Sequence, residues 1–157
     1  MASELLFAID HLDLTDVAIP PEVVGQLNPQ AGPMRQVDHV VWMAKDASAG
    51  LGVKVVRDDE FWVPYHVPGR PLMPGVMMIE AAAQLASVIY QTKSNRRGFL
   101  GFTRCDQVVF RGQVVPGDTL YLLAKEIDFR ARRIVCDAQG LVNGKLVFEA
   151  RITGMVM

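Results

Sequence analysis

The second half of the chain is dominated by runs of Val, Ile, Leu, Phe and Tyr, a composition that favours β-strands. Four such runs span residues 99–112, 118–128, 133–142 and 145–156. Turn-forming residues separate them, with Pro116-Gly117-Asp118 after the first run and Asn143-Gly144 before the last. Because an Asn-Gly pair suits the type I′ turn of a tight hairpin, the last two strands are predicted to pair antiparallel.

The first half contains two shorter runs that are rich in valine. Residues 37–43 and 53–56 are predicted strands, and the small residues from Ser48 to Gly52 are predicted to form the turn of an antiparallel pair. Residues 1–27 are interpreted as an N-terminal extension. Within it, Pro20 and Pro21 ahead of the sequence EVVGQL favour a short helix.

One long helix is predicted between Pro74 and Gln91. The segment PGVMMIEAAAQLASVIYQ has a proline at its start, no later helix breaker and four alanines. Apolar residues cover nearly every face, so we expect the helix to be buried on most sides. The sequence therefore predicts an α+β fold in which an antiparallel sheet wraps around one long central helix, with residues 1–157 as a single domain.

Composition and charge narrow the class of protein. Of the 157 residues, 50% are hydrophobic and 21% are charged, which is enough apolar surface for a buried core. The 16 Lys and Arg residues nearly balance the 17 Asp and Glu residues, so no overall positive field attracts nucleic acid or anionic lipid. The two cysteines, Cys105 and Cys136, have no metal-ligand spacing, which excludes a disulfide scaffold and a structural zinc site.

The apolar segments do not resemble targeting or membrane segments. The N-terminal sequence MASELLFAIDHLDLTD has acidic residues where a signal peptide carries Lys or Arg. The apolar stretch from Leu72 to Tyr90 contains Glu80 and Gln84, which are unfavourable in contact with lipid. We therefore expect a soluble, cytoplasmic protein with no membrane span.

Candidate chemistry is concentrated in residues 66–84, HVPGRPLMPGVMMIEAAAQ. His66 precedes three prolines and two glycines, so its imidazole is expected on a stiff loop, where it is a candidate catalytic base. Glu80 lies within an apolar helix, where a carboxylate is unfavourable unless it is paired or protonated, and a protonated carboxyl group is a candidate catalytic acid. The alternatives are a surface histidine, and a Glu80 side chain that reaches solvent or pairs with Arg70.

Three further residues complete the candidate site. Gln84 lies four residues after Glu80 on the same helix face, so its amide is expected to orient the carboxyl group. Gly75 and Val76 open the helix, where free backbone N–H groups can polarise a thioester carbonyl. His66 and Glu80 are thus the candidate catalytic residues, and Gly75, Val76 and Gln84 are the candidate substrate-binding residues. Together they suggest β-elimination of water from a 3-hydroxyacyl thioester.

These residues resemble a known signature. The stretch from His66 to Val76, followed by Glu80 and Ala83-Gln84, is similar to His-Phe-Pro-Gly-x-Pro-x-Met-Pro-Gly-Val with a later Glu and Ala-Gln, the signature of the (3R)-hydroxyacyl-[acyl-carrier-protein] dehydratases. A second stretch, residues 110–118, resembles that family's Phe-Arg-x-x-Val-x-Pro-Gly-Asp. The resemblance covers roughly residues 20–157.

The resemblance implies the hot-dog fold and a hydro-lyase of fatty acid biosynthesis that makes trans-2-enoyl-[acyl-carrier-protein] and water, with no metal or organic cofactor. It also implies a homodimer joined edge to edge, often three dimers in a hexamer, with His66 of one subunit beside Glu80 of the other. The partner is acyl carrier protein with its phosphopantetheine arm. A basic rim would steer this acidic partner. The candidates are Lys93, Arg96, Arg97, Arg130, Arg132 and Arg133.

Two departures from the family leave other functions open. Tyr65 replaces a glycine before the histidine, and residues 28–39 agree with the family only at Pro29, Pro33, Val37 and Asp38. The alternatives are a hot-dog acyl thioesterase and a non-catalytic hot-dog subunit that binds acyl chains. Three methionines near the site also allow two interpretations, since they can line an acyl tunnel or fill the core. These are Met73, Met77 and Met78.

Overall fold

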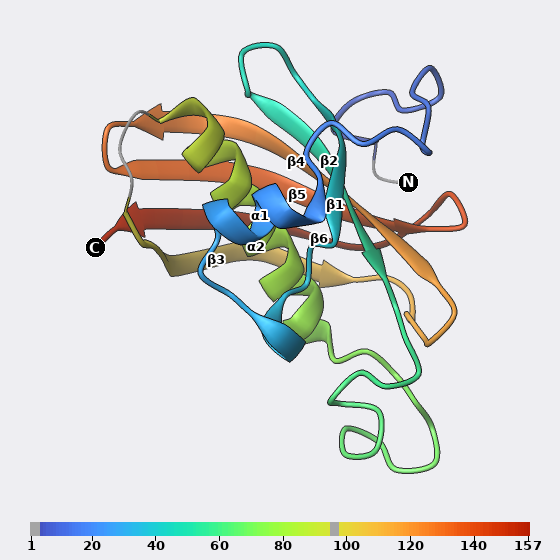
Figure 1. The fold of residues 1–157 in the computed structure, drawn as a ribbon. Helices are drawn as coiled ribbons and strands as arrows, with labels where there is room; N and C mark the ends of the chain where they lie inside the picture. Colours follow the sequence, from blue (N-terminus) through green and yellow to red (C-terminus); the bar gives the residue numbers. More distant parts are fainter. Residues whose placement is uncertain (1–3, 95–97) are drawn as a thin grey trace.

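Six strands form one antiparallel sheet in the computed structural model, which describes residues 4–94 and 98–157. Their order across the sheet is β1-β2-β4-β5-β6-β3, so β1 and β3 are the edges (Figure 1). The strands are β1 His39–Met43, β2 Ala49–Val55, β3 Leu100–Phe110, β4 Thr119–Arg130, β5 Arg133–Val142 and β6 Lys145–Val156. The predicted hairpin is confirmed, because β5 and β6 pair antiparallel on either side of Asn143 and Gly144, which both have positive φ.

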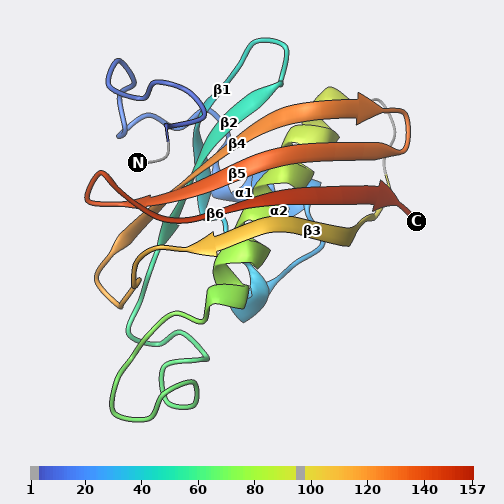
Figure 2. The ribbon, with the colours of Figure 1, turned by 180° about the vertical axis from the view of Figure 1, so that it is seen from behind.

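The sheet wraps around helix α2, Gly75–Lys93, which it covers along most of its length (Figure 2). The small side chains of Ala81, Ala82 and Ala86 are at most 2% exposed, so the sheet packs close to the helix backbone. Leu85 and Ile89 are fully buried in the same core. The predicted fold class is therefore confirmed: an α+β hot-dog fold with one long central helix.

A second, shorter helix lies on the side of α2 that the sheet leaves open. Helix α1, Pro21–Leu27, begins directly after Pro20, as the double proline predicts (Figure 1). A single turn of 3-10 helix follows at Gly32–Met34. The segment from α1 to this turn closes the core opposite the sheet, and Val24 of α1 is buried in it.

The turn between β1 and β2 lies earlier than the sequence predicted. Residues 44–48 form it, whereas residues 49–52, which were predicted as turn, belong to β2. The reason is packing against α2: a Cβ atom at Gly52 would lie 3.2 Å from Cδ1 of Leu85. The small residues there permit close approach of helix and strand, and do not mark a turn.

The first part of the N-terminal extension, residues 5–12, packs on the outer face of the sheet. Its apolar residues Leu5, Leu6, Phe7, Ile9 and Leu12 contact a second cluster made of Val41, Leu51, Val53, Leu123 and Leu141. Gln139 of β5, only 4% exposed, holds this segment: its Oε1 accepts a hydrogen bond from Leu6 N at 2.9 Å, and its Nε2 donates one to Glu4 O at 2.9 Å. The extension is therefore part of the packed structure.

Both cysteines are free thiols. Burial, followed by the nearby carboxylates of Glu126 and Asp137, raises the pKa of Cys136 to about 12. Burial also raises the pKa of Cys105, with a contribution from Asp106. Within residues 4–94 and 98–157, no helix is long and apolar enough to cross a membrane, and no three metal-ligating side chains are grouped to hold an ion.

We predict that Gln139→Ala lowers the free energy of unfolding by about 1–3 kcal/mol, because two partly buried hydrogen bonds to the backbone of Glu4 and Leu6 are lost. Urea unfolding measures the change. Gln26→Ala, at an exposed position of α1, is the matched control and should change stability by less than about 0.5 kcal/mol. Equal stability of Gln139→Ala and wild type would show that these two hydrogen bonds do not stabilise the fold.

Candidate functional site

His66 lies in the long connection between β2 and α2, residues 56–74, which has no regular secondary structure. Its Nδ1 atom is 2.7 Å from the carbonyl oxygen of Leu72. Because a carbonyl oxygen can only accept, Nδ1 of the neutral imidazole carries the hydrogen and Nε2 is left as the basic nitrogen. The fold therefore presents His66 with its tautomer already set, as a general base requires.

An apolar cavity lies beside His66. Gly75 and Val76, the first two residues of α2, line this cavity, so the structure brings the helix N-terminus and the imidazole together. Their N–H groups have no acceptor within the helix, and they are available to a carbonyl oxygen. Met73 and Met78 also line the cavity, whereas Met77 does not, and all three methionines belong to the main core.

The glycine at position 75 has a packing reason that the sequence did not indicate. A Cβ atom there would lie 2.7 Å from Cζ of Phe110, the last residue of β3. The aromatic ring therefore lies directly over the start of α2. Phe110 is 49% exposed, so the ring forms an open wall of the cavity.

Glu80 lies one turn before Gln84, and the two side chains are hydrogen-bonded. Gln84 Nε2 donates to Glu80 Oε1 at 2.8 Å and to the carbonyl of Met34 at 2.7 Å, while Gln84 Oε1 accepts from Gln36 N at 2.8 Å. Both amide hydrogens of Gln84 are thus used. Since Oε1 of Glu80 accepts one of them, a proton on this carboxyl group belongs on Oε2.

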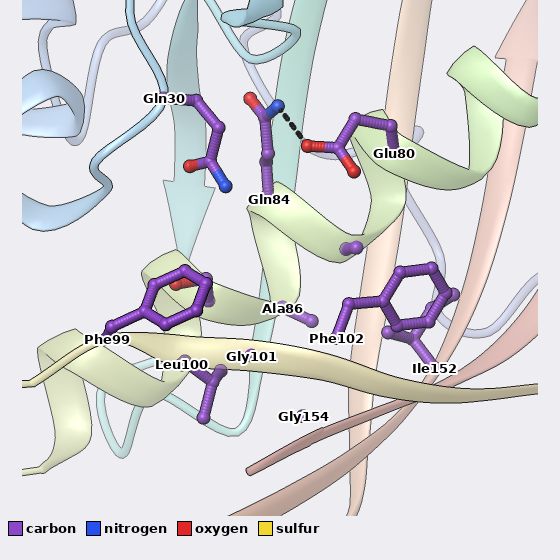
Figure 3. Close-up of a pocket in the computed structure, with 12 residues that line it drawn as sticks. Gln30, Glu80, Gln84, Ala86, Phe99, Leu100, Gly101, Phe102, Ile152 and Gly154 are labelled. Atoms are coloured by element: carbon purple, nitrogen blue, oxygen red, sulfur yellow. Dashed lines mark hydrogen bonds between the residues drawn. The ribbon is translucent and has the colours of Figure 1, made fainter. Parts of the chain in front are cut away.

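A second cavity lies beside Glu80, between α2 and the strands β3 and β6 (Figure 3). Besides Glu80 and Gln84 it is lined by Gln30, Ala83, Ala86, Ser87, Phe99, Leu100, Gly101, Phe102, Ile152 and Gly154. Glu80 is only partly buried, less than its apolar helix led us to expect, because its carboxyl group points into this cavity. Its partner is Gln84, and not the guanidinium of Arg70.

Within one chain, the structure does not bring the two candidate catalytic residues together. His66 lines one cavity with Gly75 and Val76, and Glu80 lines the other with Gln84. Both cavities open along the edge strand β3. The His66 cavity lies at the end marked by Phe110, and the Glu80 cavity lies at the end marked by Phe102.

Three of the four described residues of the predicted basic rim are paired with carboxylates of the same chain. Lys93 is 2.7 Å from Glu126, and Arg130 and Arg133 both pair with Asp128. The same arginines lower the pKa of Asp128, with the hydrogen bond from Arg133 as the largest cause. Arg132 instead donates to the carbonyl of Val156 at 3.2 Å. Two other candidates, Arg96 and Arg97, lie outside the described residues.

The sequence analysis did not identify the site residues contributed by the segment 28–36, which is part of the stretch that differs from the family signature. The side chain of Asn28 donates to the carbonyl of Gln84 at 2.9 Å, which joins this segment to α2. Gln30 lines the Glu80 cavity, and its Oε1 atom is buried with no hydrogen-bond partner in the described part of the chain. The aromatic residues Phe99 and Phe102 were also missed. Their only signal was their place in a strand-like run.

Comparison with known proteins identifies the relatives of this chain. The FabA-like domain matches residues 28–151. A 3-hydroxyacyl-[acyl-carrier-protein] dehydratase FabZ of Brucella abortus is 38% identical over 130 residues, 82% of each chain. The protein of the same name in Lactococcus lactis is 36% identical over 141 residues, 89% of this chain and 96% of that one.

Solved structures share the fold at low identity. The dehydratase heterocomplex ApeI:P of Xenorhabdus doucetiae has a TM-score of 0.72 at 14% identity and covers 85% of this chain and 90% of its own. A hypothetical thioesterase with coenzyme A from Streptococcus pneumoniae has a TM-score of 0.60 at 12% identity, covering 76% of this chain and 84% of its own. These likenesses concern the fold alone. The match over residues 28–151, together with relatives that are 36% and 38% identical over most of their length, shows that the chain belongs to the FabA-like domain family.

Proposed function

We propose that this chain is a dehydratase that converts 3-hydroxyacyl-[acyl-carrier-protein] to trans-2-enoyl-[acyl-carrier-protein] and water in fatty acid biosynthesis. One observation carries the proposal: His66 and Glu80 line two cavities along one open sheet edge. The carbonyl of Leu72 fixes the tautomer of His66, and the amide of Gln84 holds the carboxyl group of Glu80. The named activity of the relatives supports the same assignment. The reaction has no net change in oxidation state, so it needs no redox cofactor.

The active assembly is proposed to be a homodimer joined through β3. Among the residues that the structure describes, this strand pairs only with β6, so its other edge has backbone groups available to pair with a second copy. Its exposed side chains include Phe102, Val109 and Phe110, which are 44%, 39% and 49% exposed. An edge strand with exposed aromatic side chains at both ends is a surface that soluble proteins normally cover.

Antiparallel pairing of β3 with its copy also completes the site. In such a pair, the Phe110 end of one strand lies beside the Phe102 end of the other. The His66 cavity of one subunit then faces the Glu80 cavity of its partner, and a twofold axis gives two equivalent sites. The dimer therefore supplies the base and the acid that a single chain keeps apart. Whether three dimers form a hexamer remains a prediction.

Each of these residues has a separate role in the proposed reaction. The backbone N–H groups of Gly75 and Val76 hold the thioester carbonyl oxygen, where negative charge develops. Nε2 of His66 takes a proton from the carbon next to this carbonyl, and the electron pair of the broken C–H bond becomes the new double bond. Oε2 of Glu80 gives its proton to the leaving hydroxyl group, which departs as water.

The acyl chain is proposed to occupy the cavity beside Glu80. Apart from Glu80, Gln84, Gln30 and Ser87, its lining is apolar, and the small residues Ala83, Ala86 and Gly154 leave room along α2. A carrier protein would deliver this chain on its phosphopantetheine arm. Among the described candidates for the basic rim, Arg132 is the one whose partner is a backbone carbonyl rather than a carboxylate. The proposed function also predicts a cytoplasmic location.

We predict that His66→Ala and Glu80→Gln each lower kcat by ~10²-fold or more in the hydration of a crotonyl thioester, because each removes one proton-transfer group. The loss of enoyl thioester absorbance measures turnover, and thermal unfolding checks that the variants fold. Glu22→Gln, at an exposed position of α1, is the matched control and should keep full activity.

Other outcomes of this assay separate the alternatives. Release of free thiol from an acyl thioester, with no hydration of the enoyl thioester, would identify a thioesterase. Tight binding of the thioester without turnover in the wild-type protein would identify a non-catalytic subunit. Full activity of either variant would remove that residue from the mechanism.

A mixing experiment tests whether the site is shared between subunits. His66→Ala and Glu80→Gln proteins, unfolded together and refolded at equal concentration, should recover about a quarter of wild-type activity, because half of the dimers are mixed and each has one intact site of two. The separate refolded variants are the controls. No recovery, despite mixed dimers seen by native mass spectrometry, would place both catalytic residues of a site in the same chain.

A further inference from the structure

A buried ion pair joins the sheet to the connection that carries His66. Nζ of Lys54, on β2, lies 2.7 Å from Oε1 of Glu60, and the two side chains are only 1% and 3% exposed. The Lys93–Glu126 pair, by contrast, is 27% and 16% exposed. Removing two charges from water is unfavourable, and apolar residues of similar size stabilise a core at least as well. Stability alone therefore does not explain this pair.

Glu60 and His66 are the two ends of one compact run of turns. The amide of Val63 donates to the carbonyl of Glu60 at 3.0 Å, and the amides of Tyr65 and His66 both donate to the carbonyl of Trp62, at 3.1 and 2.9 Å. We call residues 60–66 the turn block. The indole of Trp62, 2% exposed, is buried in the main core. The backbone hydrogen bonds of this block therefore link Glu60 to His66.

In the described part of the chain, the turn block has few other attachments. The backbone of the connection is hydrogen-bonded to the loop between β3 and β4 at Val56, through Asp118 and Gly117, and again at Met73, through Val114. Between these two points, the ion pair, the buried Trp62 ring and the partly buried Val63 side chain hold the block. Glu60 Oε1 also accepts a hydrogen bond from Arg57 N at 3.3 Å, so the same oxygen closes the first bend of the connection.

We propose that Lys54 and Glu60 are a positioning pair, which sets the distance between β2 and the turn block and thereby the place of the His66 imidazole. The inference rests on the proposed function, because it takes His66 as the base. An apolar contact tolerates sliding, whereas a side-chain hydrogen bond, as between Lys54 and Glu60, fixes a length and a direction. A misplacement of about 1 Å in a reacting group is enough to lower turnover ~10²-fold.

Two variants of Glu60 separate position from charge. Glu60→Asp keeps both charges but shortens the side chain by one methylene, so the turn block must shift for the pair to form. We expect kcat to fall ~10-fold or more while KM stays within about twofold. Glu60→Gln keeps the length and an accepting oxygen but leaves the Lys54 charge unpaired. We expect a lower melting temperature and, per folded molecule, a kcat within about threefold of wild type.

A spectroscopic measurement reports the position of His66 directly. In protein labelled with ¹⁵N-histidine, the ring signals of His66 should move in Glu60→Asp and stay near their wild-type positions in Glu60→Gln. The matched control is Asp59→Asn in the same connection, because the Arg57–Asp59 pair is 62% and 82% exposed. This control should leave kcat and the His66 signals unchanged.

Either of two results would overturn the proposal. One is a Glu60→Asp protein with wild-type kcat and unmoved His66 signals. The other is a loss of activity that follows the loss of stability in both Glu60 variants, which would make the pair merely structural. If the wild-type protein turns over no enoyl thioester, the proposed function fails on its own. The His66 signals of Glu60→Asp then still decide whether the pair positions the imidazole.

Discussion

The close packing of α2 inside the curved sheet is the constraint on which the rest of the structure depends. The helix is apolar on nearly all faces, so it must be enclosed, and its buried alanines with the glycines of β2 allow the sheet to come close. A sheet that curves around one helix cannot enclose it completely. Glu80 therefore lies where the enclosure is open, and Gln84 beside it is buried under the segment that closes the core opposite the sheet.

This incomplete enclosure explains why both cavities lie along one sheet edge. β3 covers part of α2 but has no neighbouring strand on its outer side in the described part of the chain, and its aromatic side chains form walls that are open to solvent. Both candidate cavities therefore lie along an open sheet edge. In the proposed dimer, one interaction covers the apolar edge and joins the base of one subunit to the acid of the other.

Polar contacts determine the positions of the site side chains, which apolar packing alone does not fix. The amide of Gln84 uses both of its hydrogens and its oxygen, and so it fixes the Glu80 carboxyl group and the segment 28–36 at once. On the other side of the site, the carbonyl of Leu72 fixes the His66 tautomer. The prolines of this connection give it stiffness but no hydrogen-bonded ladder, so tertiary contacts such as Lys54–Glu60 hold it in place.

The sequence by itself determined the strands, the long helix, the Asn143-Gly144 hairpin and the identity of the candidate base and acid, because these follow from local periodicity, turn chemistry and a motif. It misplaced the β1–β2 turn, because Gly50 and Gly52 make room for side chains of α2, a helix that is remote in the chain. Only the tertiary structure decided that His66 and Glu80 occupy separate cavities, that Gln30 and Phe110 line them, and that Gln139 holds the N-terminal extension. These are contacts between segments far apart in sequence, and no local pattern encodes the distance between them.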